Sequence, residues 1–209
     1  MDVFDAGYQD IIPGYGIGEL RYIGSRSVYY AGRDLSYQRN VIFRFLKNKQ
    51  ADADETVRFQ KEYELLRELS GTSGIIRPLL MEETFYGLAM ILEDVEGRLL
   101  SETIWLPPEK IFSGTRQEDL PAASKDSKPE PGRDSREDPI LEFLSFAIAI
   151  AGVMEQLHGR GIVHQHLNPD DIVWHPPTGR AVIMDLFAAE PVSKIHKASV
   201  ISDVLTATL

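Results

Sequence analysis

A polar loop between two apolar segments is the feature that most constrains the fold of this chain. The loop reads His164-Gln-His-Leu-Asn-Pro-Asp-Asp-Ile-Val173, and it follows a long apolar stretch, Ile140–His158. That stretch is apolar nearly all round, which predicts a buried helix. Ile172–Trp174 and Ala181–Met184 flank Pro176-Pro-Thr-Gly179 and predict a short hairpin, because Pro and Gly favour turns. The fold must therefore hold a polar loop between a helix and a hairpin.

The loop and the strand after it resemble the catalytic loop and the metal-binding strand of protein kinases, which read H-R-D-L-x-x-x-N and D-F-G. His164, Leu167 and Asp185 match that pattern. Asn168 stands where other kinases carry Lys. In this the chain resembles the N-terminal serine/threonine-kinase-like domains of large multidomain sensor histidine kinases, whose catalytic loop often has Asn at that position. Other residues stand where the family carries its chemistry: Gln165 for the Arg, His166 for the catalytic Asp, Asp171 for the Asn, and Leu186 and Phe187 after the metal-binding Asp.

The order of predicted elements favours an α+β fold. Alternating β-branched and aromatic residues predict strands, and residues 54–69 form an amphipathic helix pattern with Val57, Phe59 and Tyr63 near one face. The expected strands are Tyr15–Ile23, Ser27–Gly32, Asn40–Leu46, Ile75–Glu82 and Gly87–Glu93. The resemblance implies a protein-kinase-like architecture: a five-stranded antiparallel N-lobe with one helix, plus an incomplete helical C-lobe.

The resemblance extends through the first half of the chain. Val41-Ile-Phe-Arg44 is similar to the third kinase strand, with Arg44 in the place of the Lys, and Glu62 stands where a helix Glu pairs with that Lys. Leu92–Val95 resembles the hinge, which implies that backbone groups at Glu93 and Val95 hold an adenine edge. Gly24 is what remains of the glycine-rich loop that covers the ATP phosphates.

The family's chemistry, carried over by position, implies ATP and Mg²⁺ as ligands. His166 and Asp171 occupy catalytic positions, and Asp171 with Asp185 makes a carboxylate pair suited to Mg²⁺. A neutral His can accept a proton, but its shape and reach differ from those of Asp. General-base groups contribute roughly 10²–10⁴-fold to rate, so the change predicts a large loss of activity.

Each of these positions also has a purely structural interpretation. Arg44 and Glu62 could form an ion pair with no nucleotide, because Arg and Lys are not interchangeable at phosphate sites. The turn at Gly24 could be an ordinary hairpin turn, and Asp171 and Asp185 could serve only as hydrogen-bonding loop residues.

The histidines offer a separate alternative. His164-Gln-His166 is an H-x-H pair, and His158 and His175 could join it in a zinc site. The longer metal pattern H-x-H-x-D-H would need Asp and His at positions 168 and 169, where Asn and Pro stand. The kinase resemblance explains His164 as a core-facing loop residue without a metal.

Composition and net charge limit the classes of binding partner to be expected. The net charge of −10 argues against nucleic acid or an anionic membrane as a general partner. The chain has no cysteine, which excludes disulfides and fits a cytoplasmic location. The most apolar run, Phe143–Met154, is shorter than the 18 or so residues expected of a bilayer span, so no membrane insertion is expected. Residues 1–18 lack the basic flank of a secretion signal.

Five regions are expected along the chain. They are an N-terminal tail (1–14), a kinase-like N-lobe with hinge (15–95), the start of a C-lobe (96–104), a disordered proline-rich insert (105–139) and a partial C-lobe (140–209). Only 22 residues follow Phe187, which predicts a fragment or a truncated product.

The favoured function is a catalytically impaired, pseudokinase-type signalling or regulatory module that retains ATP at its hinge. Its partner would be a signalling protein or downstream modules of a longer chain. Two alternatives stay open: a weakly active serine/threonine protein kinase that transfers the ATP γ-phosphate to protein, and a non-functional fragment of a longer kinase.

Overall fold

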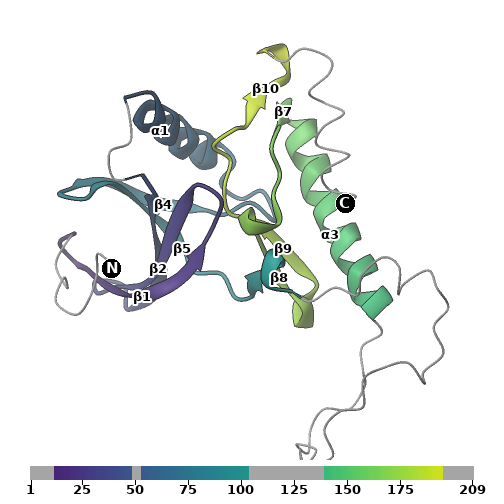
Figure 1. Ribbon diagram of the computed structural model, residues 1–209, viewed down its shortest axis with the longest axis horizontal. Coiled ribbons are helices and arrows are strands. Elements are labelled where there is room, and N and C mark those ends of the chain that lie inside the picture. The colour runs from purple at the N-terminus through teal and green to yellow at the C-terminus, as the bar shows by residue number, and fades with distance from the viewer. Residues whose placement is uncertain (1–11, 49–52, 104–138, 195–209) are drawn as a thin grey trace, which may run out of the picture.

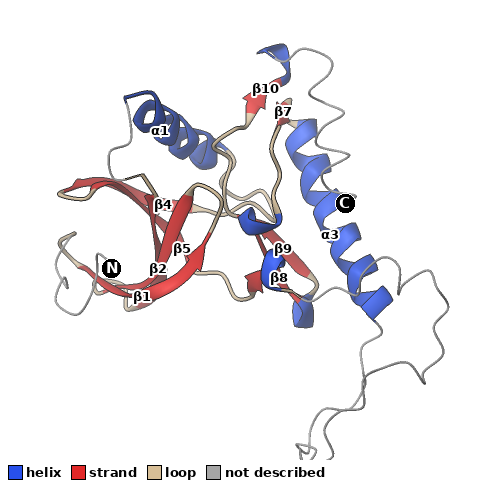
Figure 2. Cartoon of the chain, viewed as in Figure 1, coloured by secondary structure: helices blue, strands red, loops and turns tan. Residues whose placement is uncertain are grey.

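The computed structural model describes residues 12–48, 53–103 and 139–194. The fold is α+β, with a five-stranded antiparallel sheet and two long helices (Figures 1 and 2). Helix α1 lies over one face of the sheet, and a small hairpin separates the sheet from helix α3 (Figure 1). The expected insert (105–139), most of the expected tail (1–14) and residues 195–209 lie outside the described residues, apart from the helical end at Pro139.

The large sheet follows the expected strand pattern closely. Its order is β1-β2-β3-β5-β4, with every neighbouring pair antiparallel. Two strands have the expected bounds, and the others differ by one to three residues at an end. The strands are β1 (Tyr15–Ile23), β2 (Ser27–Asp34), β3 (Arg39–Leu46), β4 (Pro78–Thr84) and β5 (Gly87–Glu93).

Strand β3 is more buried than its alternating pattern suggests. Val41, Phe43 and Phe45 pack into one apolar cluster, while Ile42 packs into another on the opposite face. Arg44 faces the same side as Ile42 and is also fully buried. An alternating pattern is typical of a strand with one covered face, whereas both faces of this central strand are covered.

Helix α1 (Ala53–Glu68) begins and ends one residue before the expected range. Acidic residues in its first turn suit the positive end of the helix dipole. Its buried positions are Phe59, Glu62 and Leu66, whereas Val57 is exposed. The predicted apolar face was therefore partly wrong: the polar residue Glu62 takes a core position that an amphipathic pattern assigns to apolar residues.

The second half of the chain forms two smaller sheets. Strand β8 (Ile172–His175) lies between β6 (Arg98–Leu99) and β9 (Arg180–Ile183), and β7 (Ile162–Val163) pairs with β10 (Glu190–Pro191). The expected hairpin is thus confirmed as β8 and β9. Single-turn 3₁₀ helices flank these strands at 100–102, 169–171, 176–178 and 192–194.

Gly97 holds the crossing between the large sheet and the smaller one. Its φ is +134°, and a Cβ there would lie 2.5 Å from the carbonyl oxygen of Trp174. Glycine alone combines that backbone angle with so close an approach. The chain can therefore pass from β5 to β6 only with glycine at this position.

Helix α3 (Pro139–Gly159) extends beyond the apolar run Phe143–Met154, which was expected to be too short for a bilayer span. Only one side of the helix is buried. It is the one helix in the described part of the chain whose length and composition would allow it to cross a membrane, and 28% of the 18-residue window is buried. The prediction that it is buried all round was wrong. Its buried side chains are Phe146, Ile150, Val153, Met154 and Leu157.

One apolar cluster joins the two halves. It contains side chains of the large sheet and α1, such as Ile42 and Phe59, together with Leu157 of α3 and Trp174 of β8. A second link is made by backbone, since Ile76 N–H donates to Ile183 O at 3.1 Å and Ile183 N–H donates to Gly74 O at 2.8 Å. The sheet and the hairpin therefore share a continuous core.

Candidate functional site

The centre of the candidate site is Arg44, which is fully buried on β3. Its guanidinium forms ion pairs of 2.6 Å with Glu62 Oε1 and 2.6 Å with Asp185 Oδ2. Its Nε donates to Ser27 Oγ at 2.8 Å, and Nη1 donates to Met184 O at 3.3 Å. The structural ion pair between Arg44 and Glu62 is therefore present, and Arg44 also binds the carboxylate expected to hold a metal.

Aromatic rings enclose the same guanidinium. The Arg44 Cζ atom lies 5.7 Å from the Tyr29 ring centroid and 5.2 Å from that of Phe59. Burial by itself would lower the pKa of Arg44, but Asp185 and Glu62 raise it above its usual range. Arg44 is thus a permanently charged group within the core.

Glu62 is the second fully buried member of the cluster. Its Oε1 accepts hydrogen bonds from Arg44 and, at 2.6 Å, from the backbone N–H of Leu186. Its Oε2 is buried with no hydrogen-bond partner. Burial raises the pKa of Glu62 to about 7, with Asp185 adding to the rise and Arg44 opposing it. A proton on Oε2 would leave Arg44 and Asp185 as a balanced pair.

Asp185 has both carboxylate oxygens engaged. Oδ2 binds Arg44, and Oδ1 accepts from Phe187 N–H at 2.8 Å. Its backbone carbonyl lies 2.8 Å from His164 Nε2. Phe187 stacks under Arg26, whose Cζ lies 5.2 Å from the ring centroid. These contacts fix the segment after β9 against the turn between β1 and β2.

Asp171 is held by the same turn. Its carboxylate accepts from Ser25 Oγ at 2.7 and 2.9 Å and from Ser25 N–H at 3.2 Å. Burial raises the pKa of Asp171, Asp185 raises it further, and the Ser25 bonds oppose the rise. Gly24 packs so closely that a Cβ there would lie 3.3 Å from Asp170 O and 3.4 Å from Asp171 Oδ1.

The turn itself is a regular hairpin connection. Gly24 N–H donates to Ser27 O at 3.0 Å, and Gly24 does not adopt a positive φ. Lys47, at the end of β3, donates from Nζ to Ser25 O at 3.2 Å. Lys47 is exposed and follows the last residue of β3, Leu46.

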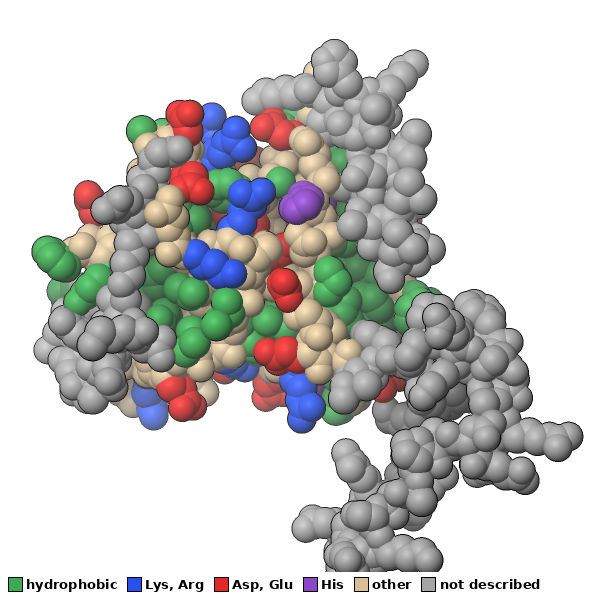
Figure 3. Space-filling view, viewed as in Figure 1, with side chains coloured by type: hydrophobic (Ala, Val, Ile, Leu, Met, Phe, Trp, Pro, Cys, Tyr) green, Lys and Arg blue, Asp and Glu red, His purple; other side chains and the backbone are tan. Residues whose placement is uncertain are grey.

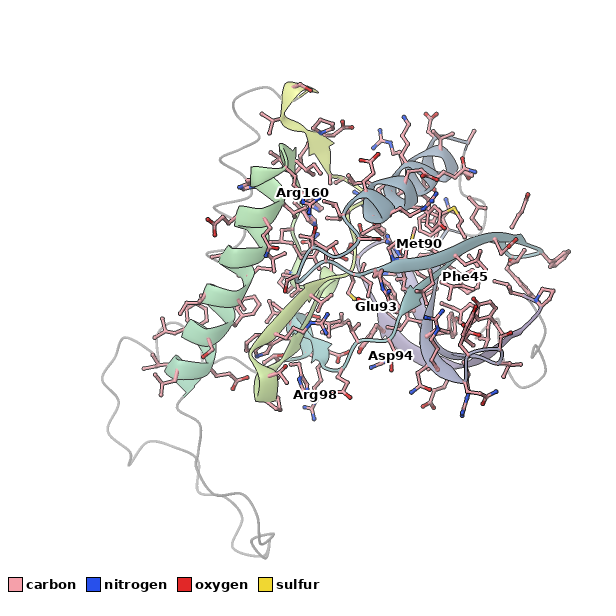
Figure 4. All side chains as sticks on the ribbon, turned by 180° about the vertical axis from the view of Figure 1, so that it is seen from behind. Phe45, Met90, Glu93, Asp94, Arg98 and Arg160 are labelled. Carbon is pink, nitrogen blue, oxygen red and sulfur yellow. The ribbon has the colours of Figure 1, made fainter. Side chains whose placement is uncertain are left out.

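The segment after β5, where the hinge was expected, is hydrogen-bonded to side chains of β1. Arg21 of β1 forms an ion pair with Asp94, and its Nη2 donates to Val95 O at 2.6 Å. Tyr22 Oη donates to Gly97 O at 3.2 Å. Glu93 N–H donates to Arg77 O at 2.9 Å. Figure 4 shows Glu93 and Asp94 where the chain leaves the sheet toward Arg98.

The two histidines of the loop from His164 to Asp171 differ in their exposure to solvent. His164 is buried, whereas His166 is exposed. Gln165 between them has a φ of +65°, a left-handed conformation that is uncommon outside glycine. His166 thus projects from a turn that is held by His164 on one side and Asp171 on the other.

Metal-binding geometry is not apparent in the part of the chain that the structure describes. Within residues 12–48, 53–103 and 139–194, no three His, Asp or Glu side chains gather as metal ligands. The histidine alternative therefore finds no support there. Acidic and basic side chains are interspersed on the face shown in Figure 3.

Sequence reasoning found Gly24, Arg44, Glu62, Glu93, Val95, His166, Asp171 and Asp185, and the structure brings all but His166 into the contacts described above. It missed Arg21, Ser25 and Ser27, which bind Val95, Asp171 and Arg44. A signal was present for two of them, because both serines follow Gly24 in the segment that stands where the kinase family has its glycine-rich loop.

No protein-family model matches this chain, and no curated protein matches it either.

Proposed function

We propose that this protein is a protein-kinase-like module that does not transfer phosphate and that acts in signalling by binding a protein partner or a neighbouring module. The observation that carries the proposal is the buried triad of Arg44, Glu62 and Asp185, with both ion pairs at 2.6 Å. A working kinase keeps the equivalent Asp for Mg²⁺ and the equivalent basic residue for phosphate oxygens. Here the two groups neutralise each other.

The second carboxylate supports the same proposal. Asp171 accepts from Ser25 N–H and from the Ser25 hydroxyl, which lies within hydrogen-bond distance of both carboxylate oxygens, so a cation between Asp171 and Asp185 would have to displace Ser25 and Arg44 together. Mg²⁺ demands near-octahedral oxygen ligands and gives up its water reluctantly. We therefore infer that Asp171 and Asp185 do not form a preorganised Mg²⁺ site.

At the hinge, Leu92–Val95, the backbone carbonyl that an adenine would need is already bonded to a side chain of the protein. The Val95 carbonyl accepts from Arg21, and Asp94 holds that guanidinium in place. ATP would have to compete with an ion pair of the protein itself before it reached the backbone. We expect adenosine and ATP to bind weakly and within about tenfold of each other, roughly 1.4 kcal/mol.

A phosphotransfer assay tests the proposal. The purified chain is incubated with labelled ATP, Mg²⁺ and a generic protein substrate, beside an Asp185→Asn variant. We expect no incorporation above the enzyme-free background in either sample. Mg²⁺-dependent incorporation by the unaltered chain that disappears in the Asp185→Asn variant would refute the proposal and favour the weakly active kinase.

A further inference from the structure

Strand β1 contains a bulge that changes the direction of two successive side chains. The strand lies at an edge of the large sheet, and its register with β2 shifts between Leu20 and Tyr22. Leu20 pairs with Tyr30, and Tyr22 pairs with Tyr29, the neighbour of Tyr30 on β2. Arg21 is therefore an extra residue on β1. Bulges of this kind are enriched next to functional sites, where they re-aim a side chain.

Arg21 and Tyr22 both reach the short segment 95–97 that follows β5. Arg21 donates to Val95 O at 2.6 Å, and the Tyr22 hydroxyl donates to Gly97 O at 3.2 Å. Successive residues of a regular strand point to opposite faces, so the bulge accounts for two contacts with one segment. Burial raises the pKa of Tyr22, which keeps its hydroxyl protonated and able to donate at neutral pH.

Tyr29 extends the contact to the residue after β9. Its side chain is buried, and its hydroxyl lies 3.5 Å from Met184 O. The rings of Tyr22 and Tyr29 meet edge to face, with their centroids 6.3 Å apart. Both rings belong to the apolar cluster that joins the two halves of the molecule. The two tyrosines therefore occupy the region between β1, the segment 95–97 and Met184.

Tyr22 brings to this region a planar ring and one hydrogen-bond donor. The ring is buried in the shared apolar cluster, and the donor binds a backbone carbonyl, Gly97 O. Sites for small molecules have the same character, since they are mostly apolar and use a few polar groups to fix orientation. A separate molecule with a flat ring and an N–H or O–H donor would make the same two kinds of contact.

We propose that Tyr22 is a built-in autoinhibitory plug: its ring occupies the binding site of a planar aromatic ligand that carries a hydrogen-bond donor. Adenine belongs to this chemical class, because it is a flat ring with an amino group. The choice of adenine rests on the proposed function, whereas the plug rests on the contacts of Tyr22 itself. Strand β1 pairs with a neighbour on one side only, so its displacement would uncover Gly97 O and leave the other four strands paired.

The plug lowers the affinity for such a ligand by the fraction of time that it stays in place. If the ring were displaced about 1% of the time, the apparent dissociation constant would be about a hundredfold above that of the open site. The Tyr22 side chain is buried and its hydroxyl is bonded, so the displaced fraction is small. Removing the ring should therefore reveal binding that the unaltered chain hides.

Calorimetric titration with adenine, without phosphate or Mg²⁺, tests the plug separately from phosphate transfer. Tyr22→Ala should bind adenine at least about tenfold more tightly than the unaltered chain, because no ring competes for the site. Tyr22→Phe keeps the ring and should bind no better than the unaltered chain. Tyr30→Ala is the matched control, because Tyr30 is as buried as Tyr22, each 5% exposed, but packs in the second apolar cluster.

Urea unfolding provides a second measurement that holds even where Tyr22→Ala is only partly folded. A ligand that binds only the folded state stabilises it by mass action. p-Cresol has the ring and hydroxyl of Tyr, so it should raise the unfolding midpoint of Tyr22→Ala, and it should do so more than toluene, which cannot donate to Gly97 O. It should leave the midpoint of the unaltered chain unchanged.

Three results would overturn the proposal. They are equal adenine affinities of the unaltered chain and Tyr22→Ala, an equal gain of adenine affinity in Tyr30→Ala, and a midpoint of Tyr22→Ala that p-cresol does not raise. Mg²⁺-dependent phosphate transfer by the unaltered chain is a different result, because it would refute the proposed function and is measured without any Tyr22 variant.

Discussion

Replacing Arg44 with Met should destabilise the protein severely at pH 8. Met replaces the aliphatic part of the side chain but leaves Glu62 and Asp185 buried without the cation that each contacts at 2.6 Å. Removing one partner of a buried ion pair costs about 3–5 kcal/mol. Since one kcal/mol shifts the melting temperature of a domain of this size by about 2–4 °C, the variant should melt about 6–20 °C below the unaltered chain.

Urea unfolding followed by circular dichroism at pH 8 and pH 5 measures this effect. The loss should be smaller at pH 5, because protonation of the buried carboxylates removes the unpaired charge. The matched control is Arg67→Met, since the exposed Arg67–Glu64 pair at 3.3 Å should contribute less than about 1 kcal/mol. The double variant Arg44→Met, Glu62→Leu should recover part of the lost stability. A loss below about 1 kcal/mol for Arg44→Met at pH 8 would refute the role assigned to the triad.

Three further predictions follow from other contacts. The pKa of Glu62 is raised from 4.5 to about 7, so the folded state holds a proton that the unfolded chain releases between these pH values. Stability should therefore fall by about 3 kcal/mol as pH rises through this window, and Glu62→Gln should flatten the dependence in urea titrations. Arg21→Ala should strengthen adenosine binding in calorimetry at least threefold by releasing Val95 O, whereas the control Arg33→Ala should change nothing, and equal affinities would contradict the hinge argument. Gly97→Ala should cost about 2 kcal/mol or more in thermal melts, because its Cβ would clash with Trp174 O; an unchanged melt would show that the crossing can relax.

Local sequence patterns determined most of the secondary structure. The bounds of β1 and β5 agree with their alternating patterns, and the hairpin of β8 and β9 agrees with its central Pro and Gly residues. The partnership of Arg44 with Glu62 was also among the expectations, but it came from the resemblance of their positions to the paired Lys and Glu of the kinase family. The strands and the hairpin depend on neighbours in the chain, which is the information that periodicity carries.

The tertiary structure decided which partners the polar groups have. Arg21 meets Val95 across 74 residues, Arg44 meets Asp185 across 141, and Ser25 meets Asp171 across 146. Only the fold sets those distances, because hydrogen bonds need donor and acceptor within about 3 Å and no local pattern encodes such an approach. The same holds for α3: its sequence is apolar nearly all round, and its packing against β7 and β9 determines that Leu157 is buried while Ile148 faces outward.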